Sequence, residues 1–425
     1  MVNRVKMPKI SIIKRVELLR PQEYILDNGI KLYSLSLSSQ DIIKINFVFD
    51  AGKYYQMKSL TANLTVEMLK EGTKNYSSIE IANLIDYYGA FLELNSDFDF
   101  AEISLYSLNK YIDKLIPVLA DIIKYPMFFD NEFEVLLRNK YNAYKVNNQK
   151  VMFIARQNFS KILFGDKHPY GMGESEESYK DILRNDIVEF YKKQYTYKNC
   201  RIYLSGKVND DIVKLLNNHF GDKWGEGFQL NKDLKYKINP SDNKRHIINV
   251  PNVIQSAIRI GKITIDRRDA DFHKLSIVTT ILGGYFGSRL QKNIREEKGY
   301  TYGIGSVLIP ARYHSLFIIS SEVISEKSRL AVEEVYNEIE KLCNKEVSKE
   351  ELERVKNYIS GQILKSIDGP FAMMNIIKII KEYELSDSYY DNYLETVNNI
   401  KPIDIIETAK KYIDINSLYE LIVGR

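Results

Sequence analysis

The sequence has few cysteines and no long apolar run. Its two cysteines, Cys200 and Cys343, stand far apart in a chain of 425 residues. Neither a disulfide framework nor a cysteine-based metal site can be built from such a pair, so both are expected to be isolated buried thiols. No apolar run approaches the roughly 20 residues that a membrane-spanning helix needs, which argues against a membrane span.

Charge of one sign is not in excess either. The chain carries 60 basic and 56 acidic residues, a net charge of +4, and the two kinds intersperse without a Lys/Arg-rich block. Nothing therefore indicates a nucleic-acid-binding protein. Residues 1–15 mix Lys and Arg with short apolar pairs and lack the apolar segment of a secretory signal, so a cytoplasmic location is expected.

A repeated plan of strand followed by helix is present instead. Ile42–Ala51 has the pattern of an apolar strand and precedes a helical stretch at Leu60–Lys70. Gln255–Ile265 alternates like a half-buried strand and precedes a helical stretch at Phe272–Leu282. The offset of a little over 210 residues is too long for a solenoid and predicts a duplicated domain.

The fold class predicted from these patterns is α+β. We expect two homologous domains, each an antiparallel sheet of about five to six strands packed with helices. The N-terminal domain is placed at residues 1–222, a polar linker at 223–245 and the C-terminal domain at 246–425, with Trp224 as an anchor against one domain. Further strands are expected at Ile30–Leu37, Phe91–Leu94, Ala101–Tyr106, Cys200–Ser205, Thr301–Ile309 and Ser315–Glu322, and further helices at Ile79–Tyr88, Leu108–Lys124, Asn131–Asn147, Asp186–Gln194, Ser328–Leu342, Lys349–Ile367 and Pro402–Tyr412.

Three motifs carry a family resemblance. The first is Leu26–Gly29, the second is the helix and Gly-Thr of Leu60–Thr73 (LTANLTVEMLKEGT), and the third is Leu282–Gly303 (LGGYFGSRLQKNIREEKGYTYG). With them the sequence resembles the insulinase/pitrilysin-like zinc peptidases. That family includes the mitochondrial processing peptidase and smaller bacterial two-domain members, and the resemblance covers nearly the whole chain.

The zinc motif of that family is missing. Its members carry an inverted His-x-x-Glu-His on the first helix, shortly before a Gly-Thr. Aligned on Gly72-Thr73, the two histidine ligands correspond to Asn63 and Glu67, the general-base glutamate to Val66 and the distal carboxylate to Tyr141. A catalytic zinc needs about three protein ligands and a nearby base, which these residues do not supply. We predict no cofactor and no metal in this chain.

The five histidines do not repair the loss. None pairs with another at the spacing of metal ligands, and His168 belongs to a His-Pro-Tyr-Gly turn that resembles a structural turn of the family. The histidines are His168, His219, His246, His273 and His314.

The third motif keeps a pair with a chemical purpose. The resemblance implies that Arg295 and Tyr302, seven residues apart, contact the substrate backbone and the oxyanion of the tetrahedral intermediate. A guanidinium and a phenol both donate to developing negative charge. The plainer alternative is that Arg295 pairs with Glu296 or Glu297 and that Tyr302 is one of 31 tyrosines filling a sheet. The surrounding match favours the first interpretation.

The glycines of the third motif fit neither a Walker loop nor a dinucleotide-binding motif. Gly283, Gly284 and Gly287 do not have the spacing of either, so a phosphate site is not expected. A helix cap, with close approach of another backbone, explains them more simply.

The pattern of a lost zinc motif and a kept Arg/Tyr pair leads to a hypothesis. The resemblance implies a non-catalytic subunit of a heterodimeric zinc metallopeptidase, inactive alone, whose homologous partner has an intact HxxEH motif and holds the zinc. The two chains would enclose a chamber for extended peptides. Two alternatives remain open: an inert scaffold or assembly protein, and a peptide-binding module that never cuts. A homodimer of the isolated chain also remains possible.

Overall fold

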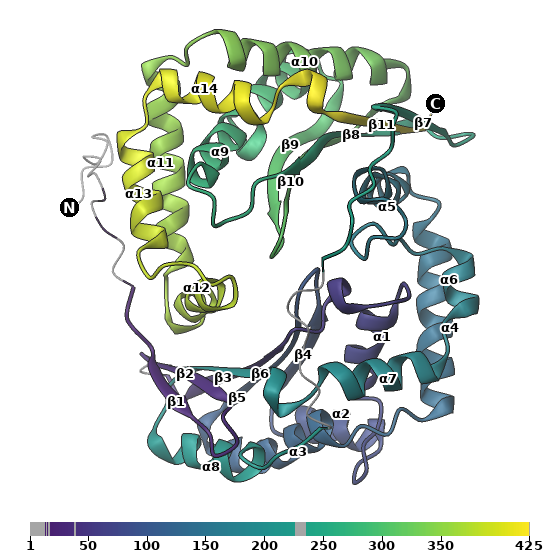
Figure 1. Cartoon of the computed structure of the whole chain (residues 1–425), viewed down its shortest axis with the longest axis vertical. Coiled ribbons are helices and arrows are strands. Elements are labelled where there is room, and N and C mark those ends of the chain that lie inside the picture. Colours follow the sequence, from purple (N-terminus) through teal and green to yellow (C-terminus); the bar gives the residue numbers. More distant parts are fainter. Residues whose placement is uncertain (1–12, 14, 16–17, 38–39, 226–234, 425) are drawn as a thin grey trace, which may run out of the picture.

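The architecture is that of a computed structural model, which describes residues 13, 15, 18–37, 40–225 and 235–424. The predictions for the first residues and for much of the linker fall outside these. Two sheets form opposite halves of the molecule, and helices pack on the outside of each sheet (Figure 1). Among the described residues, no helix is long and apolar enough to cross a membrane.

The first sheet has six strands in the order β1-β2-β6-β3-β5-β4. Neighbouring strands run antiparallel except β2 and β6, which are parallel. Its helix-covered face buries alternating Ile and Phe side chains of β3, among them Ile45 and Phe47. The strands are β1 (Gln22–Ile25), β2 (Lys31–Ser36), β3 (Ile42–Phe49), β4 (Phe91–Ser96), β5 (Ala101–Leu108) and β6 (Cys200–Gly206).

The helices of the first half follow the strands in chain order. Ser77 caps α2 in a capping box with Glu80, and Asn209 caps α8, so local sequence signals fix both starts. The helices are α1 (Thr61–Met68), α2 (Ser78–Tyr87), α3 (Ile112–Lys124), α4 (Asp130–Asn147), α5 (Val151–Phe164), α6 (Glu176–Asp181), α7 (Arg184–Gln194) and α8 (Asp210–Phe220), with a 3-10 turn η1 at Lys53–Tyr55.

The second sheet repeats the plan with five strands in the order β7-β11-β8-β10-β9. Here β7 and β11 form the parallel pair. The strands are β7 (Arg245–Asn249), β8 (Gln255–Thr264), β9 (Thr301–Pro310), β10 (Ser315–Ile324) and β11 (Tyr419–Gly424). The helices are α9 (Phe272–Thr279), α10 (Ser328–Asn344), α11 (Lys349–Ser366), α12 (Pro370–Glu382), α13 (Tyr389–Asn399) and α14 (Pro402–Tyr412), with π-helical turns η4 (Thr280–Gly284) and η5 (Gln291–Glu297).

The two halves are versions of one plan, as the sequence predicts. Strand β3 begins at Ile42 and its counterpart β8 at Gln255, and β6 begins at Cys200 and its counterpart β11 at Tyr419. The same strand order recurs in both sheets, with β1 as an addition to the first. The predicted class and the five to six strands per sheet are thereby confirmed, although each sheet includes one parallel pair.

Two equivalent helices exchange places between the halves. Helix α5 of the first half packs on β8 and β11 of the second, and α12 of the second half packs on β6 and β2 of the first. Figure 1 shows α5 beside the end of the upper sheet and α12 directly above the lower one. Met373, Met374 and Ile377 of α12 bury against Tyr33 and Tyr203 of the first sheet. Each half therefore covers part of the other half's inner face.

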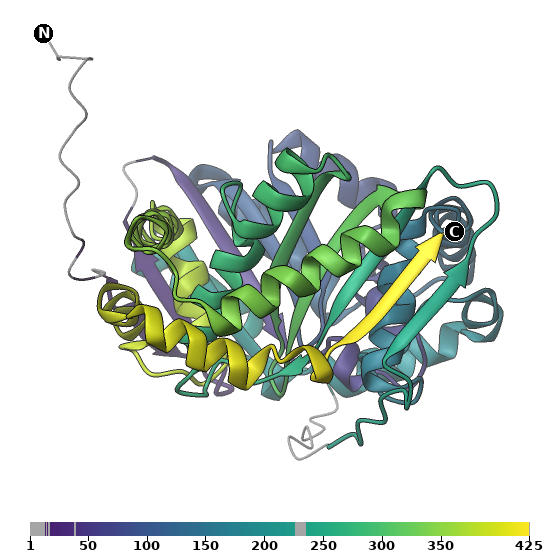
Figure 2. The same ribbon diagram turned by 90° about the horizontal axis from the view of Figure 1, so that it is seen from above.

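The tips of two equivalent hairpins also meet. The β4–β5 turn contributes Asp99, which accepts a hydrogen bond from the backbone N–H of Arg312 in the β9–β10 turn at 2.8 Å. Beside it Tyr313 lies against Tyr54 of η1, with ring centroids 4.7 Å apart. Ile13 contacts the second half as well, since its carbonyl accepts a hydrogen bond from the side chain of Asn398 on α13. In Figure 2, seen from above, the second half lies in front of the first.

Several local predictions are confirmed or corrected. Trp224 is buried against Phe49, and both cysteines are buried free thiols, as expected. Gly72 has the positive φ of 118° that a helix end requires. The cap predicted at Gly283-Gly284 is wrong, because the helix continues there into a π-helical turn without a positive φ.

Candidate functional site

The helix that carries the zinc motif in the resembling family is α1. Its Val66 is fully buried in the hydrophobic core, where a base would have no access to water or substrate. Asn63 and Glu67 are half-buried on the same helix. The carboxylate of Glu67 accepts a hydrogen bond from the ammonium of Lys140 on α4 at 2.5 Å. A lysine cation thus satisfies the one acidic group that could have contributed to metal binding.

Tyr141, at the position of the distal carboxylate, belongs to an aromatic cluster. Its ring stacks with that of Tyr144 at 6.4 Å and lies 5.4 Å from the ring of Tyr179. The ammonium of Lys145 lies over the same ring at 4.7 Å. The structure brings α1 and α4 together as the family plan requires, but a phenol among aromatic rings and a paired glutamate do not form a zinc site.

No group of three or more metal-ligating side chains occurs elsewhere in the described part of the chain. Two of the histidines pack against aromatic rings instead. Burial lowers the pKa of His168 to about 4, and its ring stacks on Phe164. Burial also lowers the pKa of His273 to about 4, and its ring stacks on Tyr393. Neutral buried imidazoles of this kind are structural.

Tyr302 stands out from the edge of the second sheet. Its side chain is 92% exposed, although β9 around it is largely ordered by pairing with β10. The pairing register shifts here, because Tyr302 and Gly303 together oppose the single residue Glu322. The hydroxyl of Thr301 donates to the Glu322 carbonyl and fixes this bulge. Bulges re-aim side chains, and this one directs the phenol away from the sheet.

Arg295 lies in the π-helical turn η5 and contacts an aromatic ring instead of an acid. Its guanidinium lies over the ring of Phe286 at 4.4 Å, and Phe286 itself is 65% exposed. Neither Glu296 nor Glu297 forms an ion pair with it among the described residues. The alternative of a local helix-end pair is therefore not what this structure contains. π-helical turns are rare and are frequent at functional sites.

Tyr302 and Phe286 border one hollow of about 760 Å³. Arg295 does not line this hollow; it contacts Phe286, which does. The structure therefore relates the predicted pair only through a third residue that the sequence interpretation did not single out. Met152 of α5 brings the other half of the molecule to the same wall. The remaining lining comes from Gln255, Gly283, Gly284, Tyr285, Gln291, Thr301, Gly303, Ile304, Gly305, Ser320, Ser321 and Glu322.

Gly283 allows the floor of this hollow to form. A Cβ at Gly283 would lie 2.4 Å from the backbone nitrogen of Ser306 on β9. The turn η4 and the strand therefore approach each other as only a glycine permits. The hydroxyl of Ser306 donates to the carbonyl of Thr279 at 2.7 Å and locks the same contact. The close backbone approach expected from the glycine motif is confirmed.

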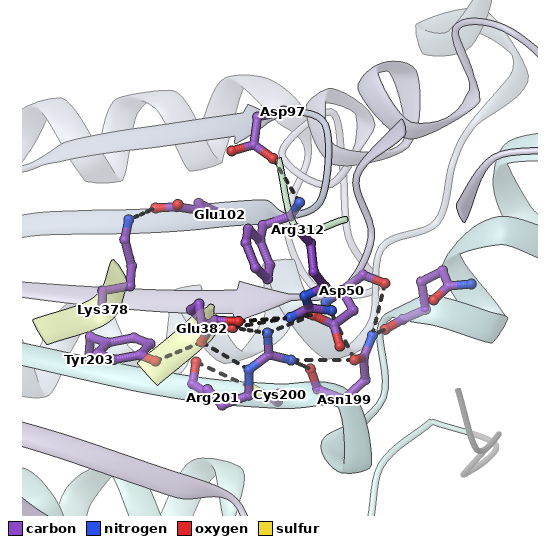
Figure 3. A network of polar contacts seen from close by, with 12 residues as sticks. Asp50, Asp97, Glu102, Asn199, Cys200, Arg201, Tyr203, Arg312, Lys378 and Glu382 are labelled. Carbon is purple, nitrogen blue, oxygen red and sulfur yellow. Dashed lines mark hydrogen bonds and ion pairs between the residues drawn. The ribbon is translucent and has the colours of Figure 1, made fainter. Parts of the chain in front are cut away.

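A buried network of ion pairs joins the two halves of the molecule (Figure 3). Arg312 of the β9–β10 turn pairs with Asp50 at 3.1 Å and donates to the hydroxyl of Tyr55 at 3.0 Å. Arg201 of β6 pairs with the same Asp50 at 2.8 Å and donates from Nε to Glu382 of α12 at 3.0 Å. Both acids are nearly fully buried, and each has an arginine of the other half as a partner, Asp50 also pairing with Arg201 of its own half.

The electrostatics of the network agree with its geometry. Burial alone would raise the pKa of Asp50, but Arg201 and Arg312 hold that pKa below its ordinary value. Both guanidiniums lie over the ring of Phe100, at 5.9 Å and 4.7 Å. Sequence reasoning missed this network because its members come from five separate segments of the chain that no local pattern connects.

Comparison with known proteins supplies the family. The family model described as "Insulinase (Peptidase family M16)" matches residues 33–167, and the one described as "Peptidase M16 inactive domain" matches residues 181–359. The chain belongs to the insulinase (M16) family and, with its zinc motif replaced, is one of the family's non-catalytic members.

Relatives span nearly the whole chain. An "Uncharacterized zinc protease" of Rickettsia bellii is 24% identical over 91% of this chain and 93% of its own length. The "Non-peptidase homolog YmxG" of Helicobacter pylori is 22% identical over 85% of this chain and 84% of its own length. A "Mitochondrial-processing peptidase subunit alpha-1" of Dictyostelium discoideum is 26% identical over 46% of this chain and 31% of its own length.

Solved structures share the fold. The M16 inactive domain from Pseudomonas fluorescens superimposes with a TM-score of 0.86 over 96% of this chain and 98% of that one, at 22% identity. A protease from Helicobacter pylori superimposes with a TM-score of 0.88 over 96% of this chain and 100% of that one, at 16% identity.

Proposed function

We propose that this chain is the non-catalytic subunit of a two-chain zinc peptidase. In this proposal a homologous partner with an intact HxxEH motif holds the zinc and the general base. The present chain contributes the wall that contains Arg295, Tyr302 and the hollow beside them. The peptide substrate lies extended between the two chains and can extend a sheet by pairing with an exposed strand edge.

The observation that supports this most is the exposure of Tyr302. A tyrosine that only fills a sheet is buried, whereas this phenol is 92% exposed and is aimed outward by a bulge. Arg295 likewise has no acid partner among the described residues and rests on an exposed ring. Two donors without a structural bond to satisfy are available to a substrate carbonyl or its oxyanion.

The replaced zinc position supports a division of labour. The ammonium of Lys140 places a positive charge beside Glu67, where the family has its metal, and Val66 is part of the core. Such a helix does no hydrolysis, yet the donor wall opposite is kept. The relatives include both a protein called a zinc protease and one called a non-peptidase homolog, and the printed name of the Dictyostelium relative refers to a subunit.

The test is reconstitution with a similar-sized HxxEH relative from the same source. The isolated chain is expected to leave a quenched fluorescent peptide uncut, and the mixture is expected to cut it. With Tyr302→Phe or Arg295→Ala in the mixture, kcat should fall by roughly 10²-fold, the scale of a lost oxyanion donor. An active mixture in which both variants match wild type would refute the assigned role.

A second candidate is a peptide-binding module that never cuts. The hollow of about 760 Å³ lies within this single chain and beside the unpaired edge of β9, which supports binding without a partner. It predicts saturable peptide binding by the isolated chain and no hydrolysis in any mixture. An inert scaffold predicts neither binding nor hydrolysis, so the two assays together separate all three possibilities.

A further inference from the structure

Arg259 is a half-buried arginine without an acid. It lies on the face of β8 that α5 covers, opposite Ser320 of β10 and Leu421 of β11. Its Nη2 donates to the sulfur of Met152 at 3.7 Å, a weak acceptor. Its Nε is buried and has no hydrogen-bond partner among the described residues. An unsatisfied buried cation of this kind costs stability, so the fold gains nothing from it as packing alone.

A second arginine lies one helical turn away. Arg156 follows Met152 by four residues on α5, and residues at this spacing lie on the same face of a helix. Arg156 is exposed, and its guanidinium lies 5.4 Å from the ring of Phe153. No carboxylate of the described residues pairs with it.

The two cations repel each other. Burial, followed by the charge of Arg156, lowers the pKa of Arg259 to about 10. Lys53 of η1 is the third cation nearby, and burial with a contribution from Arg156 lowers its pKa as well. Glu174 and Asp97 face Lys53 and offset part of this effect. Neither arginine has an acid partner among the described residues, so an anion bound by both would offset their repulsion.

Two neighbours of Arg259 line the hollow that Tyr302 borders, although neither arginine lines it directly. Met152, which contacts Arg259, also lines that hollow. Ser320, which faces Arg259 across the sheet, lines it too. An extended peptide in contact with Tyr302 would therefore lie beside Met152 and Ser320, the two residues that join the hollow to Arg259.

We propose that Arg156 and Arg259 form a subsite that binds one carboxylate of the peptide lying in this hollow. A guanidinium presents a planar fork of N–H donors that matches the two oxygens of a carboxylate, which makes this chemical class the best fit. The carboxylate is either an Asp or Glu side chain or the free C-terminus of the peptide. The proposal rests on the proposed peptide-binding function and adds a preference for acidic ligands.

Binding of labelled peptides to the isolated chain tests it. One neutral decapeptide is compared with versions that carry a single Glu at each position in turn, each with a free or an amidated C-terminus. We expect one acidic form to bind roughly tenfold more tightly than its neutral match, measured by fluorescence anisotropy at constant ionic strength. A Glu-dependent gain identifies a side chain, and a gain lost on amidation identifies the C-terminus.

Arg156→Gln should abolish that discrimination without affecting folding, since Arg156 is exposed. Arg259→Met should also abolish it and should raise the melting temperature, because an apolar side chain replaces an unpaired buried charge. Arg329→Gln, on the exposed face of α10, is the matched control and should retain the preference. Equal affinity for neutral and acidic peptides, discrimination that survives Arg156→Gln, or a destabilised Arg259→Met would overturn the subsite.

A measurement without peptide separates this subsite from the proposed function. Glutarate should raise the melting temperature of the wild-type chain relative to chloride of equal ionic strength, and Arg156→Gln should remove the increase. If glutarate stabilises through Arg156 while every peptide fails to bind, the subsite stands and the peptide-binding function fails. If glutarate has no effect and peptides bind without acidic preference, the subsite fails and the function stands.

Discussion

The backbone N–H of Arg312 donates to the carboxylate of Asp99 at 2.8 Å, and this bond joins the tips of two equivalent hairpins. The side chain of Arg312 continues from there into the buried network with Asp50. One residue of the second half thus makes both a backbone and a side-chain contact with the first.

Arg312→Ala is expected to weaken the closed arrangement. Asp50 would keep Arg201 as its partner but would lose one of its two cations in a site that is 2% exposed. The expected cost is about 3 kcal/mol in the free energy of unfolding, the scale of breaking one side of a buried pair. Urea denaturation measures it, and small-angle scattering should show an increased radius of gyration. Arg329→Ala on the surface is the control, and an unchanged midpoint for Arg312→Ala would contradict the assigned role.

Asp99 should make the stability depend on pH. Burial, the largest cause, raises its pKa from 3.8 to about 6, so the folded state binds this proton more tightly than the unfolded state. Stability from this group is therefore gained as pH falls through the window from about 6 to about 4, and lost as pH rises through it. Above pH 6 the ionised group costs up to about 3 kcal/mol.

Asp99→Asn removes that dependence. The difference in unfolding free energy between the variant and wild type should shift in favour of the variant as pH rises from 4 to 7. Taking the difference also cancels the opposite contribution of His168, which must gain a proton on unfolding in acid. Asp211→Asn, whose side chain is 83% exposed, should give a flat difference. A flat difference for Asp99→Asn would show that the buried carboxylate does not titrate in this window.

Phe286 is expected to position Arg295. Phe286→Ala removes the ring on which the guanidinium lies, so Arg295 gains freedom that must be lost again in the transition state. In the reconstituted enzyme kcat should fall roughly tenfold with little change in KM, while the melting temperature stays the same because Phe286 is 65% exposed. Phe286→Trp should restore activity, since it retains a cation-binding face. Tyr87→Ala, at another exposed aromatic, should have no effect.

The pairing of Lys140 with Glu67 makes a prediction about rebuilt metal sites. A chain carrying Asn63→His, Glu67→His and Tyr141→Glu has three ligands, but the ammonium of Lys140 remains beside them. Removing it with Lys140→Ala should raise zinc affinity roughly tenfold, because a positive charge within about 4 Å repels the metal. Competition with a chromophoric chelator measures this. Lys214→Ala, far out on α8, is the control, and equal affinities with and without Lys140 would contradict the electrostatic explanation.

Gly283 and Gly361 allow a comparison between a glycine that a close backbone approach requires and one that has free space around it. Gly283→Ala forces a Cβ against the Ser306 backbone and should cost about 1–3 kcal/mol. Gly361 lies inside α11 with nothing within 4 Å, so Gly361→Ala should stabilise by about 0.5–1 kcal/mol. Thermal unfolding of both variants tests the contrast. A neutral Gly283→Ala would show that the turn can move away from β9.

Much of the fold could be predicted because its signals are local. Alternating strands such as β8, the strand–helix repeat and the α+β class follow from side-chain periodicity. Helices α5 and α12 were missed for the same reason. Both pack on the sheet of the other half of the molecule, through contacts between residues far apart in the sequence that no local pattern indicates.

The sequence by itself determined what chemistry is missing. Residue identities at Asn63, Val66, Glu67 and Tyr141 predict the loss of the family's zinc site, because they supply neither three ligands nor a general base. Only the tertiary structure decided which groups meet: Lys140 with Glu67, Arg312 with Asp99, and Met152 with Arg259. The reason is physical, since periodicity shows which face of an element avoids water but not which distant element of the chain will cover it.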